Sequence, residues 1–235
     1  MTTLHLIPVG LGHTAPDTWL PQAAQEITRQ LRYFIAENAK TARAFLKLIN
    51  TPLAIQDIQI ETLRASTTEA EIRAWLKQIP ADQDIGLVSE AGCPAVADPG
   101  ARVVKQAHQH NIRVVPWTGP SSIMLGLMAS GLEGQRFTFH GYAPVKAPER
   151  DAQIKAWESA SHKLKQTQIL IETPYRNEAM FQALLNTLRD STQICVASAL
   201  TCPDETIQTH SVAQWRKQPI PDFDKKPTLF LFLAS

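Results

Sequence analysis

Three short loops combine glycine, proline and side-chain oxygens, and each follows a stretch that is predicted to form a β-strand. They are Gly10-Leu11-Gly12-His13-Thr14-Ala15, Ser89-Glu90-Ala91-Gly92-Cys93-Pro94 and Thr118-Gly119-Pro120-Ser121-Ser122. Glycine allows a backbone to approach a ligand closely, and proline stiffens a loop. The carboxylate of Glu90 can accept hydrogen bonds from an amine or a hydroxyl. All three loops are therefore candidates for contact with a small ligand.

Each of these loops also has a purely structural interpretation. The first loop matches G-x-G-x-x-A, the dinucleotide fingerprint, but Pro16 and Pro21 interrupt the helix that this fingerprint must open. Asp98-Pro99 is typical of a helix start, and Ser121 is a typical N-cap. A nicotinamide oxidoreductase is therefore one alternative, and plain turns and caps are another.

A fourth loop and a basic segment could contact a substrate. The loop is Glu172-Thr173-Pro174-Tyr175-Arg176, which again follows a predicted strand. The basic residues of the segment are Lys146, Arg150, Lys155, Lys163 and Lys165. Such a run usually forms a solvated helix face, but it can also contact phosphate groups. No residue in either segment stands out as a general base.

Metal chemistry and membrane insertion are not expected. Cys93, Cys195 and Cys202 have no C-x-x-C spacing, so we expect neither a zinc site nor a disulfide framework, and a reducing cytoplasm suits them. His108 and His110 lie two apart on a predicted helix and would face different sides. The N-terminus resembles a strand and not a signal peptide, and the longest uncharged run, 114–132, is broken by proline, glycine and serine.

The composition indicates a folded globular protein of one large or two small domains. The 235 residues are 44% hydrophobic and 19% charged, which excludes a disordered chain. The net charge of +1 excludes a strongly basic nucleic-acid coat protein. Any contact with RNA must therefore come from a local patch.

Predicted strands and helices alternate along most of the chain, which is typical of parallel βαβ units. The predicted strands are 4–9, 33–36, 58–62, 85–89, 112–116, 137–141, 168–172, 193–197, 206–210 and 228–233. The predicted helices are 22–31, 39–49, 67–79, 101–110, 121–130, 150–165 and 176–189. Short connections near the end favour antiparallel pairing of the last three strands. The proline-rich segment 142–149 predicts a boundary between lobes 1–141 and 142–235.

In order along the chain, the motifs resemble those of the tetrapyrrole (corrin/porphyrin) methylase superfamily. They are closest to its branch of 16S ribosomal RNA cytidine 2′-O-methyltransferases. The segments that carry the resemblance are Pro8-Val9-Gly10, Ser89 to Pro94, Asp98-Pro99-Gly100, Trp117 to Ser122, Ser130-Gly131-Leu132, Gly141 to Lys146 with Arg150, and Glu172 to Arg176. Because they cover nearly the whole chain, the resemblance is specific.

The resemblance implies two α/β lobes, with a mainly parallel sheet in the first and a mixed sheet in the second. It implies S-adenosylmethionine bound in the interlobe cleft, and a homodimer. Carried over by position, the cofactor contacts are Gly10, Glu90, Gly92, Cys93, Ser121 and Ser122, with Ile171, Leu200 and Thr228 from the second lobe. The substrate-side candidates are Lys146, Arg150, Tyr175 and Arg176.

Two segments depart from the pattern of this branch. Glu-Asp-Thr-Arg is replaced by Glu37-Asn38-Ala39-Lys40, and Arg-Glu-Leu-Thr-Lys by Ser198-Ala199-Leu200-Thr201-Cys202. The branch's small C-terminal extension has no counterpart. We therefore expect a cytoplasmic S-adenosylmethionine-dependent methyltransferase that acts on the ribose 2′-oxygen of an rRNA-like substrate. The alternatives are an S-adenosylmethionine-binding module with altered catalysis and a methylase of a small tetrapyrrole-like molecule.

Overall fold

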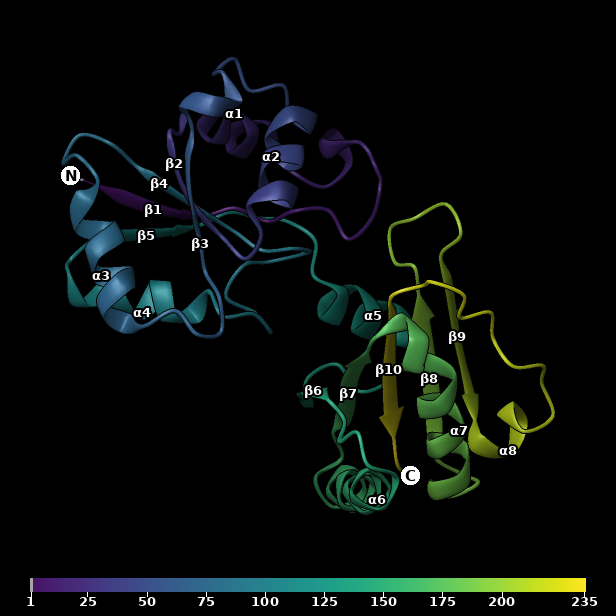
Figure 1. Ribbon diagram of the computed structural model, residues 1–235. Helices are drawn as coiled ribbons and strands as arrows, with labels where there is room; N and C mark the ends of the chain where they lie inside the picture. The colour runs from purple at the N-terminus through teal and green to yellow at the C-terminus, as the bar shows by residue number, and fades with distance from the viewer. Residues whose placement is uncertain (1) are drawn as a thin grey trace. The chain divides into compact units, whose positions relative to one another are not determined.

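The computed structural model describes residues 2–235, which form two compact units (Figure 1). The first unit ends at Ser121, and the second runs from Ser122 to Ser235. The boundary expected after Gly141 lies further along the chain than this division. The reason is that helix α5 (Ser122–Ser130) and strand β6 (Phe137–Tyr142) both pack with the sheet of the second unit.

The sheet of the first unit contains five parallel strands in the order β3-β2-β4-β1-β5. Their bounds are β1 (Thr3–Leu6), β2 (Tyr33–Ala36), β3 (Gln59–Thr62), β4 (Ile85–Val88) and β5 (Arg113–Pro116). This arrangement confirms the parallel sheet predicted from the alternating pattern. Because all five strands run the same way, the loops that leave them lie along one edge, where ligands of such sheets bind.

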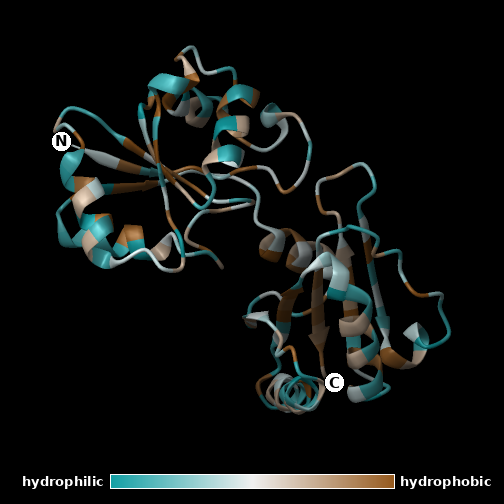
Figure 2. Ribbon diagram, viewed as in Figure 1, coloured by the Kyte–Doolittle hydropathy of each residue, from teal (hydrophilic) through white to brown (hydrophobic). Residues whose placement is uncertain are grey.

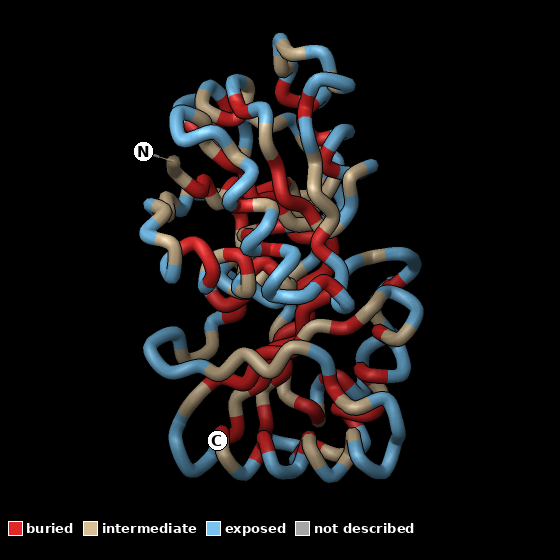
Figure 3. The backbone as a smooth tube through the Cα atoms, turned by 60° about the vertical axis from the view of Figure 1, so that its left-hand side comes forward, coloured by how far each residue is buried: buried red, intermediate tan, exposed pale blue. Residues whose placement is uncertain are grey.

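Helices cover both faces of this sheet. They are α1 (Gln22–Gln30), α2 (Ala39–Leu48), α3 (Glu69–Gln78) and α4 (Ala101–Gln109), with short 3-10 turns at Pro16–Thr18 and Ile55–Asp57. Phe34 and Leu46 belong to the core cluster beneath α1 and α2, whereas Ile72 and Val103 belong to the cluster beneath α3 and α4. The hydrophobic and buried stretches follow the strands and the inner helix faces (Figures 2 and 3).

Helix α3 begins at Glu69 and not at the predicted residue 67, whereas α4 begins at the predicted residue 101. A capping box sets the start of α3, because the Thr68 hydroxyl accepts the Glu71 N–H at 3.2 Å and the Glu71 carboxylate accepts the Thr68 N–H at 2.7 Å. The Asp98 carboxylate accepts the N–H groups of Ala95 (2.9 Å) and Gly100 (2.6 Å). Asp98 therefore closes the turn that precedes α4, which begins at Ala101.

The second unit has a mixed sheet in the order β6-β7-β10-β8-β9. Its other strands are β7 (Thr167–Glu172), β8 (Gln193–Ser198), β9 (Thr206–Ser211) and β10 (Thr228–Leu233). Strands β6 and β7 are parallel, and the remaining neighbours are antiparallel. This confirms both the mixed sheet and the predicted antiparallel pairing near the end of the chain.

Helices α6 (Ala147–Leu164), α7 (Asn177–Thr187) and α8 (Val212–Trp215) pack on one face of this sheet, around Phe181, Trp215 and Phe230. Helix α6 begins earlier than the expected residue 150, because proline at Pro148 is well tolerated in a first helical turn. Helix α5 packs on the opposite face, where Gly126 lies so close to Leu229 that a Cβ there would be 2.3 Å from its Cδ2.

The structure bears on two possibilities that the sequence did not favour, namely a membrane-spanning helix and a metal site. Between residues 2 and 235, no helix is long and apolar enough to cross a membrane. Over the same residues, no cluster of three or more His, Cys, Asp or Glu side chains could hold a metal ion.

Candidate functional site

The three glycine-containing loops of the first unit converge at the carboxyl edge of its sheet. Val9 and Gly92 form an isolated antiparallel bridge, and each donates its N–H to the other's carbonyl at 3.0 Å. The Cys93 thiol points at the carbonyl oxygen of Pro120, 3.4 Å from Sγ. The loops that follow β1, β4 and β5 are thus joined directly, as the interpretation of a shared ligand site requires.

Backbone conformation explains one glycine in these loops, and close packing explains another. Gly92 has φ +74°, a left-handed conformation that residues with a Cβ adopt at a cost. At Gly119, a Cβ would lie 2.2 Å from the Cβ of Pro8. The segment between β1 and the first loop therefore touches the third loop at a place where no larger residue fits, and this contact fixes their relative position.

Two carboxylates lie side by side at the ends of neighbouring strands. Glu37 follows β2 directly and Glu90 lies just beyond β4, and the Glu90 N–H donates to Glu37 Oε1 at 3.3 Å. Glu90 Oε1 accepts the Thr41 hydroxyl at 2.5 Å. Burial raises the pKa of Glu37, and the charges of Asp98 and Glu90 raise it further. The edge is therefore locally negative, which favours a ligand that carries positive charge.

Glu37 and Thr41 were not identified from the sequence as residues of the candidate site. The segment that begins at Glu37 differs from the motif of the resembled family, so it was treated as a departure. The available signal was positional, because a carboxylate directly after a central strand of a parallel sheet lies at the ligand-binding edge.

Cys93 is a poor candidate for a nucleophile. Burial raises the pKa of its thiol, so the neutral thiol predominates at neutral pH. Its Sγ lies against the carbonyl of Pro120 and acts as a contact between loops. A packing and positioning role in the loop therefore fits better than covalent chemistry.

The predicted cofactor residues of the second unit lie near one end of its sheet. Ile171 in β7 pairs with Leu229, and Thr228 at the start of β10 pairs with Glu172 and Ser198. The Thr228 hydroxyl lies 2.9 Å from Ser198 Oγ and accepts from Asn177 Nδ2 at 3.1 Å. Thr228 and Leu200 are both buried within this unit. Ser122 begins helix α5.

The substrate-side candidates differ in how far they are exposed and paired. Tyr175 is 85% exposed. Arg176 forms an ion pair with the buried carboxylate of Glu172 at 2.8 Å. Lys146, which directly precedes α6, pairs with Glu149 at 3.3 Å, and Arg150 pairs with Asp151 at 3.2 Å.

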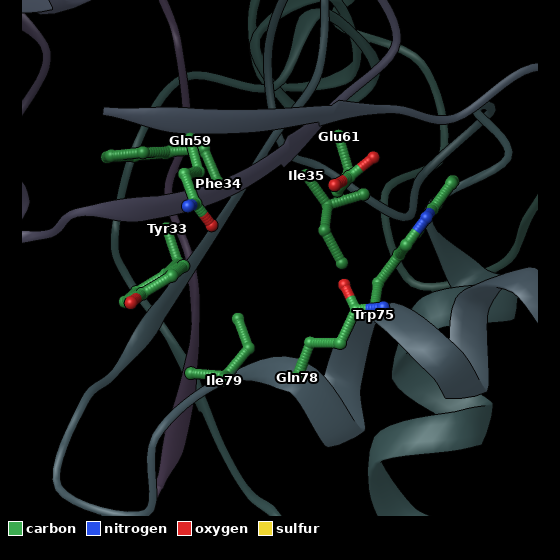
Figure 4. A pocket seen from close by; sticks show the side chains of 8 residues that line it. All are labelled: Tyr33, Phe34, Ile35, Gln59, Glu61, Trp75, Gln78 and Ile79. Atoms are coloured by element: carbon green, nitrogen blue, oxygen red, sulfur yellow. The ribbon is translucent and has the colours of Figure 1, made fainter. Parts of the chain in front are cut away.

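A pocket of the first unit lies apart from all predicted site residues. Side chains of β2, β3 and α3 line it (Figure 4), namely Tyr33, Phe34, Ile35, Gln59, Glu61, Trp75, Gln78 and Ile79. It lies beside the edge strand β3 and contains none of the three converging loops. The candidate site therefore depends on the loops and not on this hollow.

The parallel sheet with its converging loops, followed by a mixed-sheet unit, has counterparts among known proteins. Residues 3–215 match the model of the Tetrapyrrole (Corrin/Porphyrin) Methylases, and the chain belongs to this family. A solved structure, the methyltransferase CobJ, has a TM-score of 0.64 over 100% of this chain and 95% of its own, at 10% identity. That likeness confirms the expected fold of two α/β lobes.

Curated relatives of this chain are named ribosomal RNA small subunit methyltransferase I. The protein of Vibrio cholerae is 28% identical over 90% of this chain and 69% of its own length. The protein of Xylella fastidiosa is also 28% identical, over 99% of this chain and 81% of its own length. Together with the family match, these relatives establish that the chain is an S-adenosylmethionine-dependent methyltransferase.

The residues at the edge of the first sheet fit S-adenosylmethionine. This molecule carries a sulfonium and an ammonium group, and the carboxylates of Glu37 and Glu90 supply complementary charge. Gly92 and Gly119 allow the loops to pack closely against one another at this edge. The chemistry of the site therefore agrees with the methyl donor of the family.

Proposed function

We propose that this protein methylates a ribose 2′-hydroxyl of an rRNA-like substrate, in the cytoplasm and as a homodimer. The observation that carries the donor half of the proposal is the convergence of the three loops, which the Val9–Gly92 bridge and the Cys93–Pro120 contact hold together. The names of the curated relatives support the acceptor half.

In the proposed cofactor site, the chain's own residues bind and orient the donor. Gly10, Gly92 and Ser121 offer backbone, and Cys93 joins two of the loops. Glu90 is held by Thr41 and so presents its second carboxylate oxygen to a cationic group. The further cofactor contacts proposed from the family's motifs are Ser122, Ile171, Leu200 and Thr228. When bound, S-adenosylmethionine supplies an activated methyl group, so the protein mainly aligns donor and acceptor.

On the acceptor side, the proposed contacts are Lys146, Arg150, Tyr175 and Arg176. Cationic side chains position RNA through its phosphates, and exposed aromatic rings stack on unpaired bases. These four residues lie in two segments that follow the adjacent parallel strands β6 and β7, so they belong to the same end of the sheet.

A second candidate function is a module that binds S-adenosylmethionine with altered or lost turnover. Ser198 and Ala199 are uncharged and buried at positions where the resembled branch has arginine and glutamate. The Ser198 hydroxyl is engaged by Thr228 and is not available to a substrate. This arrangement removes charged groups next to the proposed second-unit contacts.

The decisive experiment incubates the protein with S-adenosylmethionine labelled in its methyl group. Small ribosomal subunits, their deproteinised RNA, total protein and a small-molecule extract are offered separately. Label in the RNA, mapped to a ribose 2′-oxygen, supports the proposal. Label only in the small-molecule fraction would favour a tetrapyrrole-like acceptor, and binding of the donor without transfer would favour the module. Light scattering of the purified protein tests the homodimer.

A further inference from the structure

One end of the second sheet carries three exposed aromatic and apolar side chains. Tyr142 is 58% exposed, Val145 74% and Tyr175 85%. Tyr142 ends β6, where it pairs with Ile171 of β7, and Tyr175 lies in the turn that follows β7. Because β6 and β7 are parallel neighbours, both tyrosines belong to the carboxyl end of this strand pair.

A backbone irregularity accounts for the exposure of Tyr142. The register between β6 and β7 shifts between Phe139 and Tyr142, as in a β-bulge. Gly141 has φ +68°, yet nothing lies within 4 Å of a Cβ built on it. The left-handed conformation, and not crowding, therefore requires glycine here. Bulges re-aim side chains and are frequent beside functional sites, and this one directs Tyr142 toward solvent.

The segment that carries Tyr175 is held rigidly. Pro174 begins a 3-10 turn, and the Arg176 N–H donates to the Thr173 carbonyl at 2.9 Å. The Arg176 guanidinium contacts the carboxylate of Glu172, which is fully buried, at 2.8 Å. A ring held on an ordered turn loses little conformational freedom when a partner stacks on it.

Cationic groups accompany these rings. Lys146 is 79% exposed in its side chain, and its pairing with Glu149 is an exposed contact that a phosphate can replace at little cost. Arg150 contacts Asp151 through Nε, and its side chain is only 17% exposed, so it lies at the border of this surface. Arg176 remains partly exposed beside Tyr175. The surface thus combines stacking rings with donors for a phosphate backbone.

We propose that this surface, the tyrosine edge, holds unpaired RNA, with one base stacked on Tyr142 and another on Tyr175. Its residues are Tyr142, Val145, Lys146, Arg150, Tyr175 and Arg176. The inference rests on the proposed function and makes it more specific. Aromatic platforms with cations are typical of single-strand binding, whereas a duplex keeps its base faces stacked inside. The tyrosine edge therefore selects an unpaired segment as the methyl acceptor.

The test measures binding of a fluorescent, unstructured RNA strand, and of the same strand annealed to its complement, by the full-length protein. Tyr142→Ala and Tyr175→Ala are each expected to weaken single-strand binding about tenfold or more, because each removes one stacked base. Tyr175→Phe keeps the ring and is expected to bind nearly as the parent does. Phe137→Ala, at the other end of β6, is the matched control. Calorimetry with S-adenosylmethionine is expected to give the same affinity for all variants.

The possible outcomes separate this inference from the proposed function. If the parent methylates RNA but both alanine variants bind the strand as well as the parent, the tyrosine edge is refuted and the proposed function stands. Equal affinity for duplex and single strand would also refute it. If the alanine variants change only the oligomeric state, the surface binds protein and not RNA. If the parent binds and methylates no RNA, the proposed function fails and the inference fails with it.

Discussion

The indole N–H of Trp117 donates a hydrogen bond to Nδ1 of His5, 3.1 Å away. Because an indole nitrogen can only donate, Nδ1 must be the acceptor, and Nε2 carries the proton that faces the Asp84 carboxylate at 3.4 Å. The imidazole is nearly buried in the first unit. Trp117 directly precedes the loop that begins at Thr118, so these two hydrogen bonds connect the third ligand loop to strand β1, which lies between β4 and β5.

Replacing Trp117 by phenylalanine is expected to loosen that loop. The ring volume is partly kept, but the buried Nδ1 of His5 loses its donor, which costs about 1–3 kcal/mol. We expect a lower melting temperature and a several-fold weaker affinity for S-adenosylmethionine, measured by thermal unfolding and calorimetry. Trp75→Phe, on α3 and away from the loops, controls for the loss of indole volume. Equal cofactor affinity in the two variants would contradict the positioning role.

Gly119→Ala is expected to push the third loop away from Pro8, which leads into the first loop. The added Cβ would meet Pro8 at 2.2 Å, so backbone must move, and forced packing of this kind costs about 1–3 kcal/mol. We predict that affinity for S-adenosylmethionine falls by at least tenfold while the far-ultraviolet circular dichroism is preserved. Gly134→Ala is the matched control, because nothing lies within 4 Å of a Cβ at that position. A Gly119→Ala protein with the parent's affinity would show that this contact does not shape the ligand site.

Glu37→Gln is expected to stabilise the protein at neutral pH. Burial raises the pKa of Glu37 above 4.5, so the folded state favours the protonated carboxyl more than the unfolded state does. The favourable contribution of Glu37 is thus complete at pH values below the unfolded pKa and is lost as pH rises through the folded pKa. In thermal unfolding at pH 7, the melting temperature of the variant should be higher than that of the parent. The difference between the two melting temperatures should vanish near pH 4.

Glu71→Gln is the control, and its effect on stability at neutral pH should have the opposite sign. Hydrogen bonds from Thr68 lower the pKa of Glu71, so its ionised form stabilises the folded protein at neutral pH. The melting temperature of this variant should be lower than that of the parent at pH 7, and the two melting temperatures should become equal as pH falls. The same pH trend in both variants would mean that the burial of Glu37 is not the cause.

Much of the fold follows from the sequence, because its signals are local. Segment 33–36 is apolar and bounded by polar residues, and it forms β2 with the predicted bounds. The boundary between units was less predictable. The prolines after Gly141 mark a loop, but the packing of Gly126 against Leu229 assigns α5 to the second sheet, and such a contact has no local signature.

The candidate site was predictable in part for the same reason. Glu90 and Gly92 stand out in the sequence, because their residue types and their position after a strand limit the structural and functional roles that they can have. The contact of Thr41 with Glu90 spans 49 residues and depends on how α2 packs against the sheet, which periodicity does not encode. The pairing of Glu37 with the Glu90 N–H likewise requires the strand order β2-β4, which follows from tertiary packing.

Glu172→Gln is expected to affect the binding of RNA but not the binding of the methyl donor. Glu172 is buried, accepts the Thr173 N–H at 2.9 Å and pairs with Arg176. Glutamine keeps an acceptor for Thr173 but removes the charge that fixes the guanidinium, so Arg176 becomes mobile beside Tyr175. We expect weaker RNA binding by about three- to tenfold and a higher KM for RNA, with a smaller change in kcat and unchanged affinity for S-adenosylmethionine. Glu178→Gln, exposed on α7, is the control, and an equal loss of RNA binding in that variant would mean that general charge and not the buried pair is responsible.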